Sequence, residues 1–238
     1  CKGVRSYFPK PVLDYQKVAE AAALINGAKK PYIVFGQGVI LGQAEELLKA
    51  VIEKTGIPAA WTILGLSALP SDHPLNVGML GMHGNYGPNI LTNECDVLIA
   101  IGMRFDDRVT GNLATYAKQA KVIHFEIDPA EVDKNVKTDV AVLGDVKESL
   151  AALLPLVEAK SHEAWHNEFK EKYKIELESV INDELNPKGE GISMGETIEM
   201  INKHSNGDAI MVSDVGQHQM FTCRYSKFNQ SKSNITSG

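Results

Sequence analysis

The chain has 238 residues, of which 44% are hydrophobic and 23% are charged, as in an ordinary globular protein. Its formal net charge of −6 and the lack of a dense Lys/Arg cluster argue against a nucleic-acid surface. No apolar run reaches the roughly eighteen residues that a membrane-spanning helix needs. The widely spaced Cys1, Cys95 and Cys223 favour a reducing compartment and no zinc site.

Predicted helices alternate with short buried strands from residue 14 to residue 158. The first helix covers residues 14–27, with Asp14 as its N-cap and Gly27 at its end. The other helices are expected at 44–56, 87–94 and 146–158, and the strands at 31–38, 57–63, 96–102, 121–128 and 139–145. Short Val/Ile-rich strands that alternate with helices form parallel sheets covered on both faces. The sequence therefore predicts an α/β fold with a doubly wound parallel sheet.

The sequence becomes more polar after residue 160. Residues 161–186 predict a long linker helix, which the stretch from Pro187 to Gly191 ends. A helix over 193–205 then begins with the capping box of Ser193 and Glu196, and residues 207–220 open another strand–helix unit. We expect a domain at 1–158, a helical linker at 159–191 and the start of a second α/β domain at 192–238. Because the chain starts at Cys1 and stops just after a strand-like NIT, we expect a piece of a longer protein.

The stretch VGMLGMHGNYGPN, residues 77–89, places glycine at every third position from Gly78 to Gly87. Each glycine costs about 0.5–1 kcal/mol relative to alanine inside regular structure. Collagen has this period, but the run is too short and its other residues do not fit. We expect the missing side chains to let the backbone approach a flat or charged ligand.

Every predicted strand ends in a polar or glycine-rich stretch. In open parallel sheets ligands bind beyond the carboxyl ends of the strands. Carboxylates there accept hydrogen bonds from ribose hydroxyls, arginines bind phosphate, and glycine amides or helix N-termini cradle pyrophosphate. The sequence therefore predicts a dinucleotide site, to which the strand ends contribute Gly36, Gly38, Thr62, Arg104, Asp106, Asp107, Arg108, Glu126, Asp128, Gly144 and Asp145.

An ordinary NAD site is disfavoured. The glycine spacing of Gly36, Gly38 and Gly42 is G-x-G-x-x-x-G, and no acid follows the second strand. Purely structural alternatives stay open for single features. The glycines can form a simple strand-to-helix turn, and Arg104 with its acidic neighbours can be a self-paired surface cluster. Structural roles are also open to His83, Met79, Met82 and the His162/His166 pair, the last on a solvated helix face.

Four motifs in order resemble the large catalytic subunit of acetohydroxyacid synthase (acetolactate synthase), a thiamine-diphosphate enzyme family. They are MLGMHGNYGPN, IGMRFDDRVTG, IHFEIDPAEVDKN and SDVGQHQM. The resemblance covers essentially the whole chain and implies a central FAD-binding domain, a linker and the first strand–helix unit of a thiamine-binding domain. In that family FAD takes no redox part. The enzyme decarboxylates pyruvate on thiamine diphosphate with Mg²⁺ and joins the remaining two-carbon unit to pyruvate or 2-ketobutyrate, which begins branched-chain amino-acid synthesis.

The resemblance also implies which residues bind the cofactors. Those for FAD are Gly36, Gln37, Gly38, Thr62, Ile63, Leu80, Gly81, Met82, His83, Gly102, Arg104, Asp106, Arg108, Val109, Glu126, Ile127, Gly144 and Asp145, and those for thiamine diphosphate are Val215, Gly216, Gln217 and His218. The family's catalytic glutamate belongs to a preceding domain, and its Mg²⁺ ligands lie beyond residue 238. We therefore expect no catalytic or metal-binding residue within the chain, and no activity from the chain alone. Phe221 stands where the family usually has Trp.

The implied setting is a bacterial cytoplasm, with a homodimer or larger assembly, an optional regulatory small subunit, and neither nucleic acid nor membrane as partner. Three alternatives stay open. One is another thiamine-diphosphate enzyme of the glyoxylate carboligase or pyruvate oxidase type. The second is a non-catalytic scaffold domain that has lost its nucleotide. The third is an NAD-dependent oxidoreductase, which the missing acid after the second strand disfavours.

Overall fold

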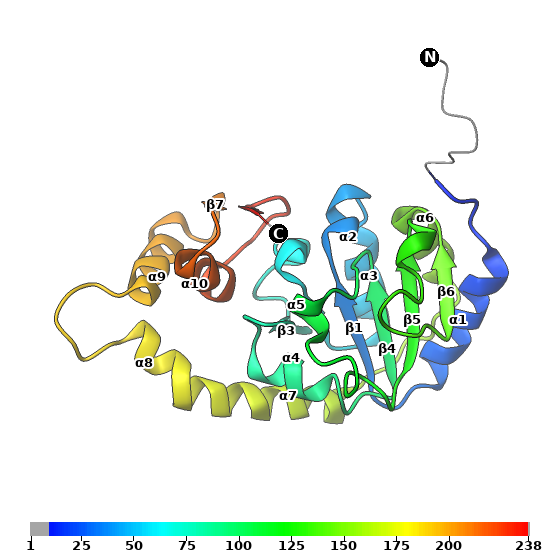
Figure 1. Ribbon diagram of the computed structural model, residues 1–238, viewed down its shortest axis with the longest axis horizontal. Coiled ribbons are helices and arrows are strands. Elements are labelled where there is room, and N and C mark those ends of the chain that lie inside the picture. The colour runs from blue at the N-terminus through cyan, green and yellow to red at the C-terminus, as the bar shows by residue number, and fades with distance from the viewer. Residues whose placement is uncertain (1–9, 238) are drawn as a thin grey trace, which may run out of the picture.

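A computed structural model describes residues 10–237 (Figure 1). Cys1 and the outermost residues of the predicted regions 1–158 and 192–238 lie outside this range. Six parallel strands form the main sheet, in the order β3-β2-β1-β4-β5-β6. They are β1 (Pro31–Phe35), β2 (Ala59–Trp61), β3 (Asn76–Met79), β4 (Val97–Ile101), β5 (Lys121–Glu126) and β6 (Val140–Leu143). The strand order reverses between β1 and β4, so the predicted doubly wound parallel sheet is confirmed.

The main predicted helices are confirmed. They are α1 (Tyr15–Gly27), α3 (Glu45–Thr55), α4 (Tyr86–Leu91) and α6 (Val146–Leu153). Asp14 caps α1 by accepting hydrogen bonds from the amides of Gln16 and Lys17. The short helices α2 (Gln37–Leu41) and α5 (Asp107–Thr110), and 3₁₀ turns at Ile63–Gly65 and Pro129–Glu131, were not predicted. Each is too short to show a helical period in the sequence.

Strand β3 is the one strand of the main sheet that the sequence prediction missed, because its residues were assigned to a glycine-rich loop. It lies at the edge of the sheet, and its pairing with β2 shifts register between Ala59 and Trp61. Only Met79 of its residues is buried. A half-exposed edge strand that contains a glycine lacks the Val/Ile run by which buried strands are identified.

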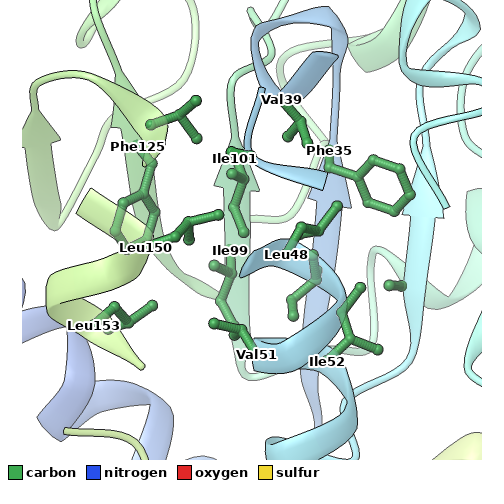
Figure 2. Close-up of a cluster of buried hydrophobic side chains, with 14 of the residues drawn as sticks. Phe35, Val39, Leu48, Val51, Ile52, Ile99, Ile101, Phe125, Leu150 and Leu153 are labelled. Atoms are coloured by element: carbon green, nitrogen blue, oxygen red, sulfur yellow. The ribbon is translucent and has the colours of Figure 1, made fainter. Parts of the chain in front are cut away.

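The core follows the two-residue period of the strands. Ile33 and Phe35 of β1 belong to the same buried cluster as Ile99 and Ile101 of β4. Figure 2 shows Phe35, Ile99 and Ile101 on the face of the sheet that α3 and α6 cover. The alternate residues, such as Tyr32 and Val34, face the opposite side and belong to a second buried cluster. Both faces of the sheet are therefore covered, which is the reason that its central strands are apolar throughout.

The chain beyond residue 160 forms a long helical run, which passes below the sheet in Figure 1, and a small C-terminal unit, residues 193–237, which the figure shows at the left. The elements are α7 (Glu163–Glu176), a π-helical turn (Leu177–Ile181), α8 (Asn182–Leu185), α9 (Met194–Ser205), β7 (Met211–Ser213), α10 (Gln217–Tyr225) and β8 (Asn234–Thr236). Strands β7 and β8 pair in parallel as a separate sheet. The capping box at the start of α9 is confirmed.

The linker helix and the C-terminal unit both pack on the central domain. Trp165 and Phe169 of α7 are buried in the second core cluster, and the Trp165 indole donates to the Pro31 carbonyl at 2.8 Å. Phe228, which follows α10, is fully buried in the main core. Among residues 10–237, no helix is both long and apolar enough to cross a membrane.

Replacing Leu48 by alanine is expected to destabilise the protein by about 2–5 kcal/mol, since this fully buried side chain fills the space between α3 and the sheet. The measurement is the free energy of unfolding from urea titration. Leu41→Ala is the matched control because Leu41 is 73% exposed, and it should change stability by less than about 0.5 kcal/mol. Equal losses in both variants would contradict the described core.

Candidate functional site

The segments that follow the six strands form one hydrogen-bonded row along the carboxyl edge of the main sheet. The amide of Gly36 donates to the carbonyl of Ile101 at 3.0 Å, and that of Gly102 donates to Phe125 at 2.9 Å. The same pattern joins Leu80 to Trp61, Thr62 to Phe35, and Gly144 to Glu126. The row therefore brings together residues from five predicted strand ends and from the glycine run, in the order Leu80, Thr62, Gly36, Gly102, Glu126, Gly144.

The centre of this row is a contact between two stretches of backbone at the switch point. A Cβ atom on Gly38 would lie 2.6 Å from the Cα of Gly102, and one on Gly36 would lie 2.7 Å from the Gly102 carbonyl oxygen. Gly102 itself has φ of +57°. The Gly36 amide donates to the carbonyl of Ile101, the last residue of β4, and the Gly38 amide donates to the carbonyl of Gly102. These two amides are therefore engaged within the protein, and a bound anion needs other donors.

The glycine run that continues from β3 also packs against the protein itself. A Cβ on Gly78 would overlap the side chain of Asn85, and one on Gly84 would overlap the Met79 carbonyl. Gly81 has φ of +117°, and a Cβ there would lie 2.9 Å from the Arg108 carbonyl oxygen. Close packing within the protein therefore explains why these three positions are glycine, without any ligand.

Two asparagines fix the shape of the glycine-rich loop, by which we mean residues 79–86. Asn85 Oδ1 accepts a hydrogen bond from the Met79 amide at 2.9 Å. Asn89 bonds both the amide and the carbonyl of Gly81, each at 2.9 Å. The loop thus presents Met82, which is 59% exposed, and the half-buried His83 at the edge of the sheet. Neither asparagine was among the predicted site residues, although both lie in the motif that carried the resemblance.

Arg104, Asp106 and Arg108 lie together next to this loop. Asp106 caps α5 by accepting from the amides of Arg108 and Val109, and it also accepts from Arg104 Nε at 3.1 Å. Arg108 connects to the loop through its carbonyl, which accepts from the Met82 amide at 2.7 Å. The Arg104 side chain is 62% exposed, and Arg108 is also exposed. The self-pairing that the sequence left open is thus present for Arg104 and Asp106, and both arginines still face solvent.

Glu126 ends β5 with an ionised carboxylate that is largely enclosed. Oε1 accepts hydrogen bonds from the amides of Ile127 and Asp128, at 2.8 and 3.1 Å. Oε2 lies 3.5 Å from Nε2 of His124, which is fully buried and also donates to the Met103 carbonyl at 2.8 Å. Burial opposes ionisation of Glu126, but these donors outweigh it and lower its pKa. Sequence reasoning did not identify His124, which is hidden within a strand.

The remaining predicted FAD residues flank the row. Gln37 is exposed at the start of α2, Ile63 and Val109 are half-buried, and Ile127 is 43% exposed. Asp145 caps α6, and its carboxylate lies 2.7 Å from Lys10 Nζ, a hydrogen bond that lowers the pKa of the aspartate. All predicted FAD residues therefore lie at or beside one edge of the sheet.

The four predicted thiamine-binding residues lie elsewhere, at the start of α10: Val215 and Gly216 precede this helix, and Gln217 and His218 are its first two residues. Val215, Gln217 and His218 are exposed, and Gly216 is the residue before the helix. A Cβ on Gly216 would lie 2.9 Å from the His218 ring. These residues follow one another in the chain, and Figure 1 shows their elements, β7 and α10, to one side of the main sheet.

The cysteines and the His162/His166 pair within residues 10–237 do not form a site. Burial raises the pKa of the Cys95 and Cys223 thiols to about 12, so both stay protonated at neutral pH. His162 precedes α7 and His166 lies in its first turns; burial lowers the pKa of both. Over residues 10–237, no three His, Cys, Asp or Glu side chains gather as a metal site would require.

Comparison with known proteins supports the family resemblance. The family described as "Thiamine pyrophosphate enzyme, central domain" matches residues 18–153. The probable acetolactate synthase large subunit of Methanocaldococcus jannaschii is 39% identical over 98% of this chain and 40% of its own length. The acetolactate synthase large subunit of Lactococcus lactis is 39% identical over 94% of this chain and 38% of its own length.

Acetolactate synthase of Mycobacterium bovis is 37% identical over 98% of this chain and 38% of its own length. The chain thus spans about two fifths of the curated relatives that it matches. The family match covers the parallel sheet and the row of strand ends from β1 to β6. Sequence motifs, sheet topology and family match agree, and we conclude that the chain belongs to the thiamine pyrophosphate enzymes and contains their central domain.

Proposed function

We propose that the central domain binds FAD along the carboxyl edge of the main sheet. The observation that carries this proposal is the row of strand ends, which lines up residues from six strands at a topological switch point. An extended dinucleotide fits such a row better than a compact ligand does. The exposed arginines and the ionised Glu126 add the charges that a pyrophosphate and a ribose require.

Each part of the dinucleotide has suitable partners along this edge. Because the Gly36 and Gly38 amides are engaged, Arg104 and Arg108 are the candidates for pyrophosphate. Glu126 would accept hydrogen bonds from adenosine hydroxyls through Oε2, the oxygen without an amide donor. The glycine-rich loop would face the flavin ring, and FAD would serve there as a bound structural group.

For the whole protein we propose acetolactate synthase activity, as the names of the relatives suggest. Thiamine diphosphate with Mg²⁺ would supply the decarboxylation of one 2-ketoacid and its joining to a second. In this chain residues 215–218 would contact it. Exposed Val212 and Ile235 leave one face of the β7–β8 sheet uncovered, as expected if a larger domain completes it. A cytoplasmic homo-oligomer, with or without a regulatory subunit, completes the proposal.

FAD titration of the protein at its natural full length tests the proposal. Flavin fluorescence should be quenched in a saturable manner, and excess NAD should not displace FAD. Formation of acetolactate from pyruvate, measured on the same preparation, separates the synthase from a glyoxylate carboligase or pyruvate oxidase. An absence of saturable FAD binding would contradict the cofactor assignment and leave the scaffold alternative.

Arg104→Ala is expected to weaken FAD binding by about 1.5–3 kcal/mol, the usual contribution of a hydrogen bond to a charged group. Lys121→Ala is the matched control. Lys121 is 63% exposed and paired with Asp139, much as Arg104 is 62% exposed and paired with Asp106, but it begins β5 at the opposite edge of the sheet. Titration of both variants should reveal a loss in Arg104→Ala alone. Unchanged affinity in that variant would assign Arg104 to its ion pair only.

The affinity for FAD should decrease in acid as Glu126 becomes protonated. Its pKa lies below the ordinary value of 4.5, so the carboxylate is present above pH 4.5 and is lost as the pH falls through the lowered pKa. Glu126→Gln should bind FAD more weakly at neutral pH and lack this part of the pH dependence. Titrating groups of FAD itself affect both proteins equally. Parallel pH profiles would therefore exclude Glu126 as a ligand.

A further inference from the structure

Glu176 is the only buried Asp or Glu side chain in the part of the chain that the structure describes. It is the last residue of α7, directly before the π-helical turn, and its side chain is 4% exposed. It belongs to neither the proposed FAD row nor the thiamine loop. A buried carboxylate is costly unless it is paired and hydrogen-bonded, so its contacts indicate what it holds in place.

The contacts of Glu176 join three segments that are far apart in the sequence. Oε1 lies 2.5 Å from Nη2 of Arg224 in α10. Oε2 accepts a hydrogen bond from the Tyr86 amide at 3.0 Å, and Asn85 Nδ2 lies 3.4 Å from both oxygens. Arg224 also reaches the Gly84 carbonyl, at 3.4 Å. One carboxylate thus links the linker helix, the glycine-rich loop and α10.

Asn85 extends this link into the part of the loop that would face the flavin. Its side-chain oxygen accepts a hydrogen bond from the backbone amide of Met79 at 2.9 Å, and its backbone amide donates to the Met79 carbonyl at 2.8 Å. These bonds close the loop around Leu80, Met82 and His83. At the other end of the link, Arg224 lies on α10, the helix that begins at the proposed thiamine loop.

The side of the loop that faces Glu176 borders a groove. This groove of about 420 Å³ opens beside the ion pair, lined by Gly84, Tyr86, Asn89, Ile175, Glu176, Ser179, Val180 and Arg224. Tyr86 is 41% exposed. Met79 and Leu80 anchor one end of the loop in the core, and at this groove the other end is held by the polar contacts of Tyr86 to Glu176 and of Gly84 to Arg224.

We propose that Glu176 is a positioning residue, which sets the conformation of the glycine-rich loop and fastens it to α10. The role in cofactor binding rests on the proposed FAD function. Glu176 touches no reacting group and acts through Asn85, Tyr86 and Arg224. Removing it should loosen residues 79–86 and disturb the flavin environment without affecting the distant strand ends.

The test uses the double variant Glu176→Ala/Arg224→Ala in the protein at its natural full length. Removing both partners leaves no unpaired buried charge, so the fold is expected to survive. Amide hydrogen exchange of residues 79–86 should become faster, the Kd for FAD should rise about five- to tenfold, as for loss of one hydrogen bond, and the visible spectrum of bound flavin should shift. Glu168→Gln is the control, since Glu168 lies on the same helix and pairs with Lys30 at 2.8 Å, away from the loop.

Faster exchange confined to the loop, with a shifted flavin spectrum and an unaffected Glu168→Gln control, would support the proposal. Unchanged exchange in residues 79–86 would overturn it, and so would equal effects in the control. If the unmodified protein binds no FAD, the proposed function fails, and hydrogen exchange alone then decides whether Glu176 positions the loop.

Discussion

The backbone contact between Gly38 and Gly102 is the constraint on which the carboxyl edge of the sheet depends. Chains leaving β1 and β4 diverge at a switch point and open a crevice between them. Here the two chains touch at the level of Cα, because neither residue has a side chain. The hydrogen bonds of Gly36, Gly38 and Gly102 then align the strand ends on both sides. A larger residue at this contact would separate β1 from β4 and disrupt the row.

This close contact also decides how the edge can recognise a negative charge. In many nucleotide folds the amides after the first strand bind phosphate. Here the Gly36 and Gly38 amides bond Ile101 and Gly102, so under the proposed function positive charge would come from Arg104 and Arg108. Asp106 orients Arg104 and caps α5 at the same time. Because both arginines are exposed, their attraction for an anion is screened by salt.

The sequence patterns predicted most of the fold and less of the site. Helix caps such as Asp14 and Ser193 are local, and they were read directly from neighbouring residues. The strand-end rule placed its residues at one edge of the sheet, where the structure has them, but it could not say that the glycines pack on the protein itself. Strand β3 was missed because it has no apolar run.

Long-range polar contacts were beyond sequence reasoning. Glu176 meets Arg224 at a separation of 48 residues and Asn85 at a separation of 91 residues. In the sequence Glu176 is one of many charges on a polar helix. Its burial results from how α7, α4 and α10 come together, which no local pattern encodes. His124 was hidden for a related reason, since its partner Met103 belongs to the segment after the neighbouring strand.

Phe228 anchors the C-terminal unit to the central domain. Its ring is fully buried in the main core, and its amide and carbonyl both bond Ser71, each at 2.9 Å. Swinging the unit away would expose the ring at a cost of about 1.5–3 kcal/mol, in addition to the two hydrogen bonds. A ligand could drive such a hinge motion only if it favoured the open form by at least that much. The connection between the central domain and the C-terminal unit is therefore not a free hinge.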